Sequence, residues 1–187
     1  MKEAILFIAS VLLAATVQAI TIEGFTGPYA ESEWTQQIPN HPGSVGVINF
    51  VTTNTLEIVG LQGGEWCGLE VTASIEIHQT GQISFDFSVT EDGYHYDGKF
   101  IVRKLRDGEP AELLNLNTTQ SGTFTKQFAQ GEVLELAIYS VCEAFPAASV
   151  TITNFSHTAF LVPLTSHSVY LLMFLIGGFL IFRLRQL

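Results

Sequence analysis

Positive charge is scarce in this sequence. It has 8 Lys and Arg residues against 18 Asp and Glu residues, and its formal net charge is −10 at pH 7. Lys2, Glu3, Arg183 and Arg185 lie near the apolar ends, so the part between them keeps 17 acidic and 5 basic residues. Such a surface repels phosphate groups, which argues against nucleic acid and anionic lipid as partners. It is compatible with divalent cations, with neutral polymers, or with solubility alone.

Motifs for catalysis and for zinc are also missing. The sequence contains no Gly-x-Ser-x-Gly elbow, and its five histidines stand apart, so a Ser-His-Asp hydrolase is not expected. A zinc site needs several His or Cys ligands at close spacing, and His95 with Asp97 is all that the sequence offers. We therefore expect a protein without enzymatic activity.

Cysteine is limited to Cys67 and Cys142. In an exported protein an even pair predicts a disulfide bond. This bond would close a loop of about 75 residues and stabilise the fold by roughly 4 kcal/mol. The alternative is two free, buried thiols.

Helical periodicity is absent from the centre of the chain, where apolar and polar residues alternate instead. The alternation runs through 70–78 and resumes in 82–90 after Gln79-Thr80-Gly81, which predicts a β-hairpin with one exposed face. Short strands separated by glycine-containing turns predict an all-β fold, an antiparallel β-sandwich or jelly roll, for residues 20–158. Further strands are expected at 45–50, 56–60, 99–105, 111–116, 123–128, 133–141 and 149–155.

The N-terminus has the three parts of a secretory signal peptide. Lys2 supplies the positive start, Ile5–Ala15 the apolar stretch, and Val17-Gln18-Ala19 the small residues of a cleavage site. We expect cleavage after Ala19, so that residues 1–19 are the signal peptide and the rest of the chain is exported.

The C-terminus contains fourteen consecutive apolar residues, Val169–Phe182. A helix that begins at Pro163 reaches Arg183 after about 21 residues, and at about 1.5 Å per residue it spans a hydrocarbon core of roughly 30 Å. Arg183 and Arg185 then lie on the cytoplasmic side by the positive-inside rule. Residues 159–187 are therefore predicted to hold a single transmembrane helix, with the domain outside the cytoplasm.

The order of elements in this tail is Val162-Pro163-Leu164, an apolar helix, and Arg183-Leu184-Arg185. It resembles the PEP-CTERM sorting signal of exported proteins from Gram-negative bacteria that make extracellular polysaccharide. The resemblance implies processing near Val162-Pro163 by a sorting peptidase of the exosortase type and delivery to the cell envelope, the outer surface or the extracellular matrix. It implies no catalysis. The domain contributes to the resemblance through Phe25-Thr26-Gly27-Pro28-Tyr29-Ala30, Trp34-Thr35, Thr80–Phe87, Gln120–Phe124 and Val150–Ser156.

Two groups of carboxylates are candidate sites. Glu91, Asp92 and Asp97 lie in a glycine-bounded loop with two tyrosines, and their oxygens suit Ca²⁺; the loop could also contact a sugar or be simply solvated. Glu76 and Asp86 are expected on the exposed face of the predicted hairpin, where they could approach the separation of about 5 to 9.5 Å that glycoside hydrolysis needs.

Three functions remain open at this point. The first is an exported, non-enzymatic β-sandwich protein that is sorted through its tail and associated with extracellular polysaccharide. The second is a permanently anchored, single-pass surface module for adhesion or reception that binds glycan or calcium. The third is a surface glycosidase.

Overall fold

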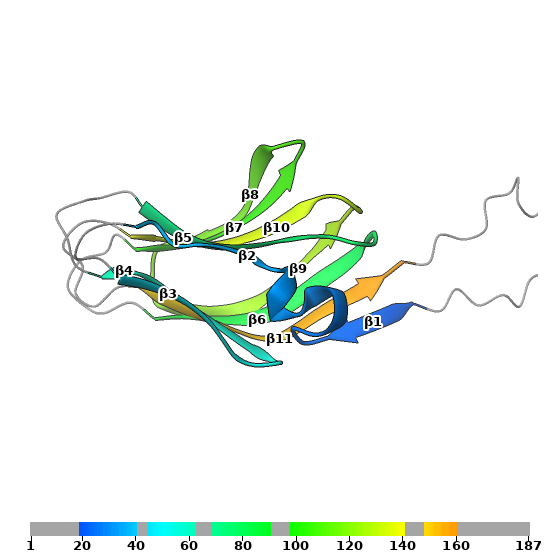
Figure 1. Cartoon of the computed structure of the whole chain (residues 1–187), viewed down its shortest axis with the longest axis horizontal. Helices are drawn as coiled ribbons and strands as arrows, with labels where there is room; N and C mark the ends of the chain where they lie inside the picture. Colours follow the sequence, from blue (N-terminus) through cyan, green and yellow to red (C-terminus); the bar gives the residue numbers. More distant parts are fainter. Residues whose placement is uncertain (1–18, 41–44, 63–68, 91–97, 141–147, 161–187) are drawn as a thin grey trace, which may run out of the picture. The chain divides into compact units, whose positions relative to one another are not determined.

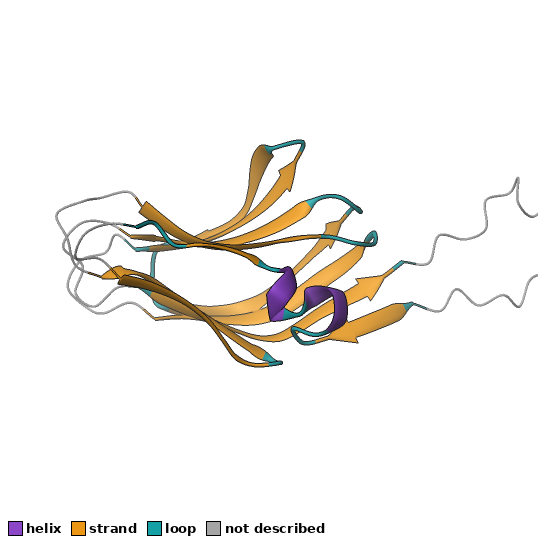
Figure 2. Cartoon of the chain, viewed as in Figure 1, coloured by secondary structure: helices purple, strands orange, loops and turns teal. Residues whose placement is uncertain are grey.

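The alternating segments form two antiparallel sheets that pack face to face, so the fold is all-β and sandwich-like, as predicted (Figures 1 and 2). The computed structural model describes residues 19–40, 45–62, 69–90, 98–140 and 148–160. Ile20–Ala159 is one compact unit. Along the strand Gly81–Thr90 every second residue is buried, because successive residues of a strand point to opposite faces of the sheet, whereas the edge strands Val45–Thr52 and Glu109–Leu116 have no buried residue.

Sheet 1 has the strand order β3-β4-β11-β6-β9, and β1 pairs with the far end of β11. Sheet 2 has the order β2-β5-β10-β7-β8. Two short 3-10 helices, η1 (Gly27–Tyr29) and η2 (Glu31–Glu33), lie between β1 and β2. Sheet 1 consists of β1 (Ile20–Glu23), β3 (Val45–Thr52), β4 (Thr55–Gln62), β6 (Gly81–Thr90), β9 (Gln120–Phe128) and β11 (Ser149–Ala159), and sheet 2 of β2 (Thr35–Gln37), β5 (Leu69–Glu76), β7 (Lys99–Arg106), β8 (Glu109–Leu116) and β10 (Val133–Ser140).

The predicted hairpin over 70–90 is wrong. Both of its segments are strands, but β5 pairs with β2 and β10 in sheet 2, whereas β6 pairs with β11 and β9 in sheet 1. The chain crosses between the sheets directly after Ile77. The Ile77 N–H donates to the Glu132 carbonyl at 2.8 Å, and its carbonyl accepts from the Gly131 N–H at 2.9 Å. Alternation identifies which face of each strand is buried, but it does not identify the neighbouring strand.

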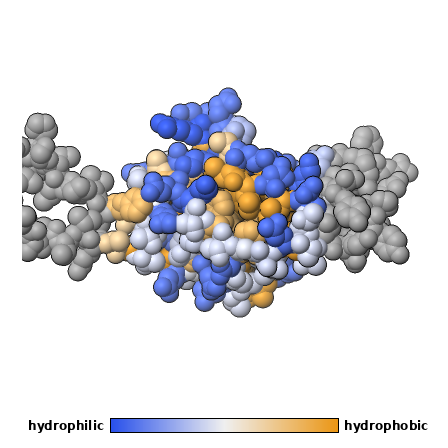
Figure 3. Space-filling model, turned by 180° about the vertical axis from the view of Figure 1, so that it is seen from behind, coloured by the Kyte–Doolittle hydropathy of each residue, from blue (hydrophilic) through white to orange (hydrophobic). Residues whose placement is uncertain are grey.

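The core lies between the sheets and consists of aliphatic and aromatic side chains from both. Phe85 stacks on Phe124 with ring centroids 4.8 Å apart, and Phe87 lies 5.8 Å from Phe100 across the sheets. Burying one large apolar side chain contributes about 1.5 to 3 kcal/mol, so these contacts account for much of the stability. The side of the molecule that faces away from the viewer in Figure 1 is mainly hydrophilic around a central apolar area (Figure 3).

Both ends of the domain lie at the same pole of the sandwich. Ile20 of β1 is the register partner of Ala159 at the end of β11, and Glu23 is the partner of Ser156. The β1 strand was not predicted from the sequence, and β11 is longer than the predicted 149–155. Because its first and last strands hold each other, the domain has the organisation of an independently folding unit.

Candidate functional site

An aromatic cluster fixes the segment that carries the candidate site. Phe25 stacks on Phe155 of β11 at 5.1 Å, and Trp34 lies 6.0 Å from Phe155 and 5.9 Å from Phe50 of β3. The Trp34 indole N–H donates to the Tyr29 carbonyl at 3.0 Å, which satisfies the one polar group of the ring. Trp34 is therefore buried, and it anchors η1, η2 and β2 on the core.

The turn into this segment requires glycine. Gly24 has a φ of 69°, and a Cβ at this position would clash with Asn54 Oδ1 and with the Thr53 carbonyl. Only glycine adopts this conformation without strain and also allows such a close approach of the backbone. The Gly24 N–H donates to the Phe155 carbonyl at 2.7 Å, so the turn is tied to β11.

Beyond the turn, the sandwich is open along the edge between β2 and β3. The β2 strand has three residues, and Gln36 is the register partner of Ala73, a residue of the core. Gln36 therefore projects from the inner face of sheet 2. The Gln36 amide therefore occupies a position on the inner face of sheet 2 that an apolar side chain would occupy in a closed sandwich. On the opposite side, the inward-facing Ile48 and Phe50 of β3 are only half-buried.

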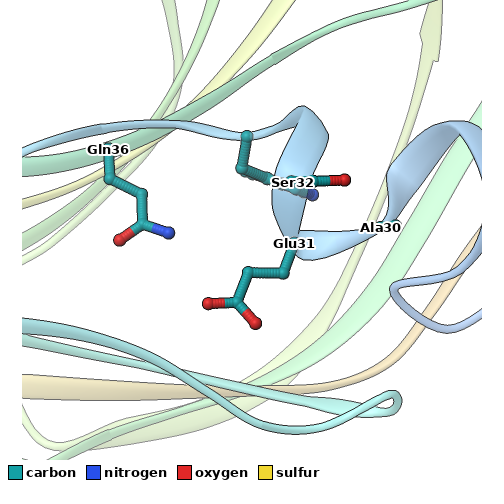
Figure 4. A pocket seen from close by; sticks show the side chains of 5 residues that line it. Ala30, Glu31, Ser32 and Gln36 are labelled. Carbon is teal, nitrogen blue, oxygen red and sulfur yellow. The ribbon is translucent and has the colours of Figure 1, made fainter.

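This opening is a depression of about 640 Å³ lined by Ala30, Glu31, Ser32, Trp34 and Gln36. Glu31 and Gln36 both extend into the space between the η2–β2 segment and the β3–β4 hairpin (Figure 4). The described lining therefore combines a carboxylate, an amide and a hydroxyl beside an indole ring. These groups can donate and accept several hydrogen bonds at once.

The described lining of the depression lacks the pair of carboxylates that acid-base hydrolysis of a glycoside requires. Glu31 is the one carboxylate among its described lining residues, whereas acid-base hydrolysis of a glycoside needs two carboxylates that face each other. Its sides are open to solvent, so charges developing in a reaction would not be shielded from water. A hydroxyl-rich ligand, in contrast, gains from the available donors and acceptors.

Glu76 and Asp86 do not form the carboxylate pair predicted from the hairpin. Glu76 is exposed on the outer face of sheet 2, and Asp86 lies on the outer face of sheet 1, so the core separates them. Asp86 accepts hydrogen bonds from Thr123 Oγ1 at 2.6 Å and from Asn154 Nδ2 at 2.8 Å. These hydrogen bonds lower the pKa of Asp86. They hold a bulge in β11, where Asn154 has a φ of 53°.

A second, smaller depression of about 290 Å³ lies beside this bulge. Within the described ranges, no group of three or more His, Cys, Asp or Glu side chains is arranged to hold a metal ion. The smaller depression is therefore not a cation site of that kind. It is lined by Glu23, Gly24, Asn54, Asn154, Phe155 and Ser156.

Two of the histidines are close together in the fold, although the sequence separates them. The rings of His78 and His157 lie 6.3 Å and 5.2 Å from the ring of Tyr29. His157 and Tyr29 are buried, and neither the imidazole nitrogens nor the phenol oxygen has a hydrogen-bond partner in the described part of the chain. Burial raises the pKa of Tyr29 to about 12, and the nearby backbone of His78 acts in the opposite direction and lowers it by less. Burial lowers the pKa of His157.

Several sequence-predicted residues lie outside the described ranges. These are the calcium candidates Glu91, Asp92 and Asp97, the cysteines Cys67 and Cys142, and the tail residues Val162, Pro163, Arg183 and Arg185. Ala19 is described, and it is exposed directly before β1. Among the described residues, no helix has the length and apolar character that crossing a bilayer requires.

Sequence reasoning missed the residues of the depression and the Tyr29–His157 pair. The available signal was the segment from Gly24 to Gln37, which is rich in aromatic and polar residues but does not alternate. A segment of this kind at the start of a β domain indicates a folded loop held by its aromatic side chains.

No family model matches the chain, and no curated protein is similar to it. Among solved structures, a mutant of a carbohydrate binding module family 29 is 10% identical, with 76% of this chain and 94% of that chain covered and a TM-score of 0.47. A mutant of a family 29 module complexed with mannohexaose is 13% identical, with 79% and 100% covered and a TM-score of 0.43. The secreted serine protease VesC from Vibrio cholerae is 11% identical, with 65% of this chain and 26% of that chain covered and a TM-score of 0.46. Likeness at this level transfers neither a ligand nor an activity to this chain.

Proposed function

We propose that this protein is an exported, non-enzymatic β-sandwich protein of the cell envelope or extracellular matrix that binds a neutral polysaccharide. The observation that carries the proposal is the depression at the open edge of the sandwich, which Glu31, Ser32 and Gln36 line together with the buried Trp34. Sugar hydroxyls match these side chains, because a carboxylate accepts hydrogen bonds while an amide and a hydroxyl both donate and accept them.

The shape and the charge of the domain narrow the ligand class. The depression is open, which suits a segment of a long chain better than a small molecule that must be enclosed. The exported part of the chain carries 17 acidic against 5 basic residues, so it repels polyanions such as uronate-rich polysaccharides. A neutral polysaccharide satisfies both conditions.

Delivery to the envelope follows from the two ends of the chain. The signal peptide ending at Ala19 directs export, and the tail that resembles a PEP-CTERM signal directs a membrane-bound stage and processing by an exosortase-type peptidase near Val162-Pro163. The pairing of Ile20 with Ala159 supports this arrangement, because cuts after Ala19 and near Val162 leave the whole domain intact. Without the second cut, the protein remains a single-pass surface module.

Polysaccharide binding can be tested on the fragment 20–159, which contains the whole sandwich and its core. We expect affinity gel electrophoresis and calorimetry to detect binding to one of the neutral polymers mannan, β-glucan or galactan, and not to alginate. Gln36→Ala removes an amide and Glu31→Ala removes a carboxylate, so each deletes a hydrogen-bonding group and should weaken binding about tenfold. Gln127→Ala, an exposed amide of β9 at the far edge of sheet 1, is the matched control and should bind like the wild type.

The binding proposal fails if none of these neutral polymers binds, or if the Gln36 and Glu31 variants bind as tightly as the Gln127 control. Delivery is tested separately by the intact mass of the protein isolated from its own cells. A product that begins at Ile20 and ends near Val162 supports sorting. A product that keeps Arg183 and Arg185 supports permanent anchoring.

A further inference from the structure

The edge strand β3 exposes an apolar stripe. Val45, Val47 and Val51 are 64%, 39% and 52% exposed, and the neighbouring Ile38 is 43% exposed. These are four of the six exposed large apolar side chains of the described residues. In that part of the chain β3 pairs only with β4, so the backbone N–H and C=O groups of its second edge have no strand partner among the described residues. A strand of this kind is a template for pairing with another strand.

The other edge strands carry the features that prevent such pairing. The β8 strand contains Pro110 with Glu109 and Glu112, and β9 exposes Lys126. The β2 strand has only three residues, and β1 has four and ends in a glutamate. Proline, charged side chains and short length each block edge-to-edge association. The eight residues of β3, Val45–Thr52, include no charged residue and no proline, and the irregularities on this strand are two register shifts in its ladder with β4, between Val45 and Val47 and between Phe50 and Thr52.

We propose that β3 is the interface on which a second copy of this chain pairs its own β3, antiparallel and across a two-fold axis. The net charge favours this edge over the others, because both copies are acidic. Self-pairing of β8 would bring Glu109 and Glu112 toward the same residues of the other copy. Self-pairing of β3 brings no charged side chain of either strand to the new ladder.

Several registers keep inward-facing side chains of β3 opposite inward-facing ones, and the register centred on Ile48 is among those that match the most residues. With Ile48 opposite Ile48 of the second copy, Val45 lies opposite Val51, Val47 opposite Asn49, and Gly46 opposite Phe50. Exposed side chains then meet exposed side chains, as a continuous sheet requires. On the inner face of the sheet, Gly46 of one copy lies opposite Phe50 of the other, so a small residue leaves room for a large one. A shift by one residue would place inward-facing side chains opposite outward-facing ones.

The pairing is expected to be weak in dilute solution. A ladder of about seven residues per strand buries less than the roughly 800 Å² per partner of a standard interface. We therefore expect a dissociation constant in the micromolar range or above. Two linked depressions would also bind one polysaccharide chain with avidity; this consequence rests on the proposed function, whereas the pairing itself does not.

Sedimentation equilibrium of the fragment 20–159 over a concentration series tests the pairing. We expect a monomer–dimer equilibrium. Val47→Lys places a charge on the exposed stripe of each copy and should raise the dissociation constant at least about tenfold. Ser121→Lys makes the same charge change on β9, at the other edge of sheet 1, and should leave the equilibrium unchanged.

Oxidative cross-linking tests the register. In Ile48→Cys the two introduced cysteines lie directly opposite each other, within the Cα separation of about 4.5 to 5.5 Å that a disulfide accepts, so a covalent dimer should form. In Val51→Cys they are six residues apart along the strands, about 20 Å, and no cross-link should form. The native Cys67 and Cys142 are present in both variants, so the difference between them isolates the new bond.

Three results would overturn the proposal. The first is a monomer at every concentration. The second is a dimer that survives Val47→Lys but is lost in Ser121→Lys, which would place the contact at β9. The third is an open-ended series of oligomers, which would indicate head-to-tail pairing of β3 with β9 instead of a two-fold axis. None of these results bears on polysaccharide binding by the monomer, which the Gln36 and Glu31 variants test.

Discussion

The phenol of Tyr29 should make the domain unstable at high pH. Its hydroxyl is buried without a hydrogen-bond partner among the described residues, and burial raises its pKa from 10.0 to about 12. Between pH 10 and 12 the unfolded chain loses this proton while the folded chain keeps it. The free energy of unfolding therefore falls as the pH rises through this range. The full contribution is present below pH 10.

The size of the effect follows from the shift. At about 1.36 kcal/mol per pKa unit, the rise from 10.0 to about 12 corresponds to about 2.7 kcal/mol in the free energy of unfolding. About 1.4 kcal/mol of this free energy is lost by pH 11. In Tyr29→Phe the ring remains and the titrating group is removed. The free energy of unfolding of this variant should therefore not show the decrease between pH 10 and 12 that Tyr29 causes in the wild type. At pH 7 it should be as stable as the wild type or about 1 kcal/mol more stable, because a buried hydroxyl without a partner is unfavourable.

The measurement is urea unfolding of the wild type and Tyr29→Phe at several pH values from 7 to 11.5. Other groups also titrate at high pH, so the difference between the two proteins is the quantity that matters, and it should grow above pH 10. Tyr139→Phe is the matched control, because Tyr139 is half-buried on the outer face of sheet 2, and this variant should follow the wild type. If the wild-type and Tyr29→Phe curves stay parallel from pH 9 to 11.5, the assignment of the raised pKa to Tyr29 is refuted.

The remaining predictions concern three other positions. Burial lowers the pKa of His157, so the unfolded chain takes up a proton below about pH 6.5 that the folded chain does not. Acid should therefore destabilise the wild type more than His157→Leu, measured by urea unfolding from pH 7.5 to 5. Gly24→Ala should lower the melting temperature more than Gly108→Ala, because both glycines have a positive φ but a Cβ clashes only at Gly24; equal losses would contradict this. Arg103 Nη1 donates hydrogen bonds to Glu70 Oε2 at 2.6 Å and to Glu135 Oε1 at 2.9 Å. Arg103→Ala leaves both carboxylates without this shared partner. It should lower the free energy of unfolding by about 1 to 3 kcal/mol, less at high salt if the contribution is mainly electrostatic.

Strand positions and buried faces could be predicted from the sequence, because alternation reports directly on which side chains are buried. Residues 82–90 illustrate this: Ile83, Phe85, Phe87 and Val89 are all buried. Strand pairing could not be predicted in the same way. The short connection after Ile77 is compatible with a hairpin and with a crossing between sheets, and the choice depends on hydrogen bonds to Gly131 and Glu132, which are more than fifty residues away. The same long-range dependence explains why the predicted pair Glu76 and Asp86 is separated in the fold.

The candidate site escaped prediction for a related reason. In Gly24–Gln37 the residues that fix the segment depend on distant partners: Gly24 approaches the Thr53 backbone, and Trp34 packs on Phe155. In the sequence alone, nothing distinguishes Gln36 from any other polar residue. It becomes a candidate ligand-binding residue only because its register partner, Ala73, belongs to the core. A local pattern cannot contain this information.

The short β2 strand connects the two proposals. It covers only three of the eight residues of β5, so the edge of the sandwich stays open and Gln36 reaches the solvent from an inward-facing position. Along the same edge, β3 keeps its exposed valines and, within the described ranges, has no second strand partner. An added strand on β3 would extend sheet 1 without filling the depression under sheet 2, since the lining residues that are described come from η2, β2 and the adjoining Ala30 and Trp34. Polysaccharide binding should therefore survive Val47→Lys with its monomer affinity unchanged. If this substitution instead abolished binding at concentrations where the protein is monomeric, β3 itself would be part of the polysaccharide site, and the separation of the two surfaces would be wrong.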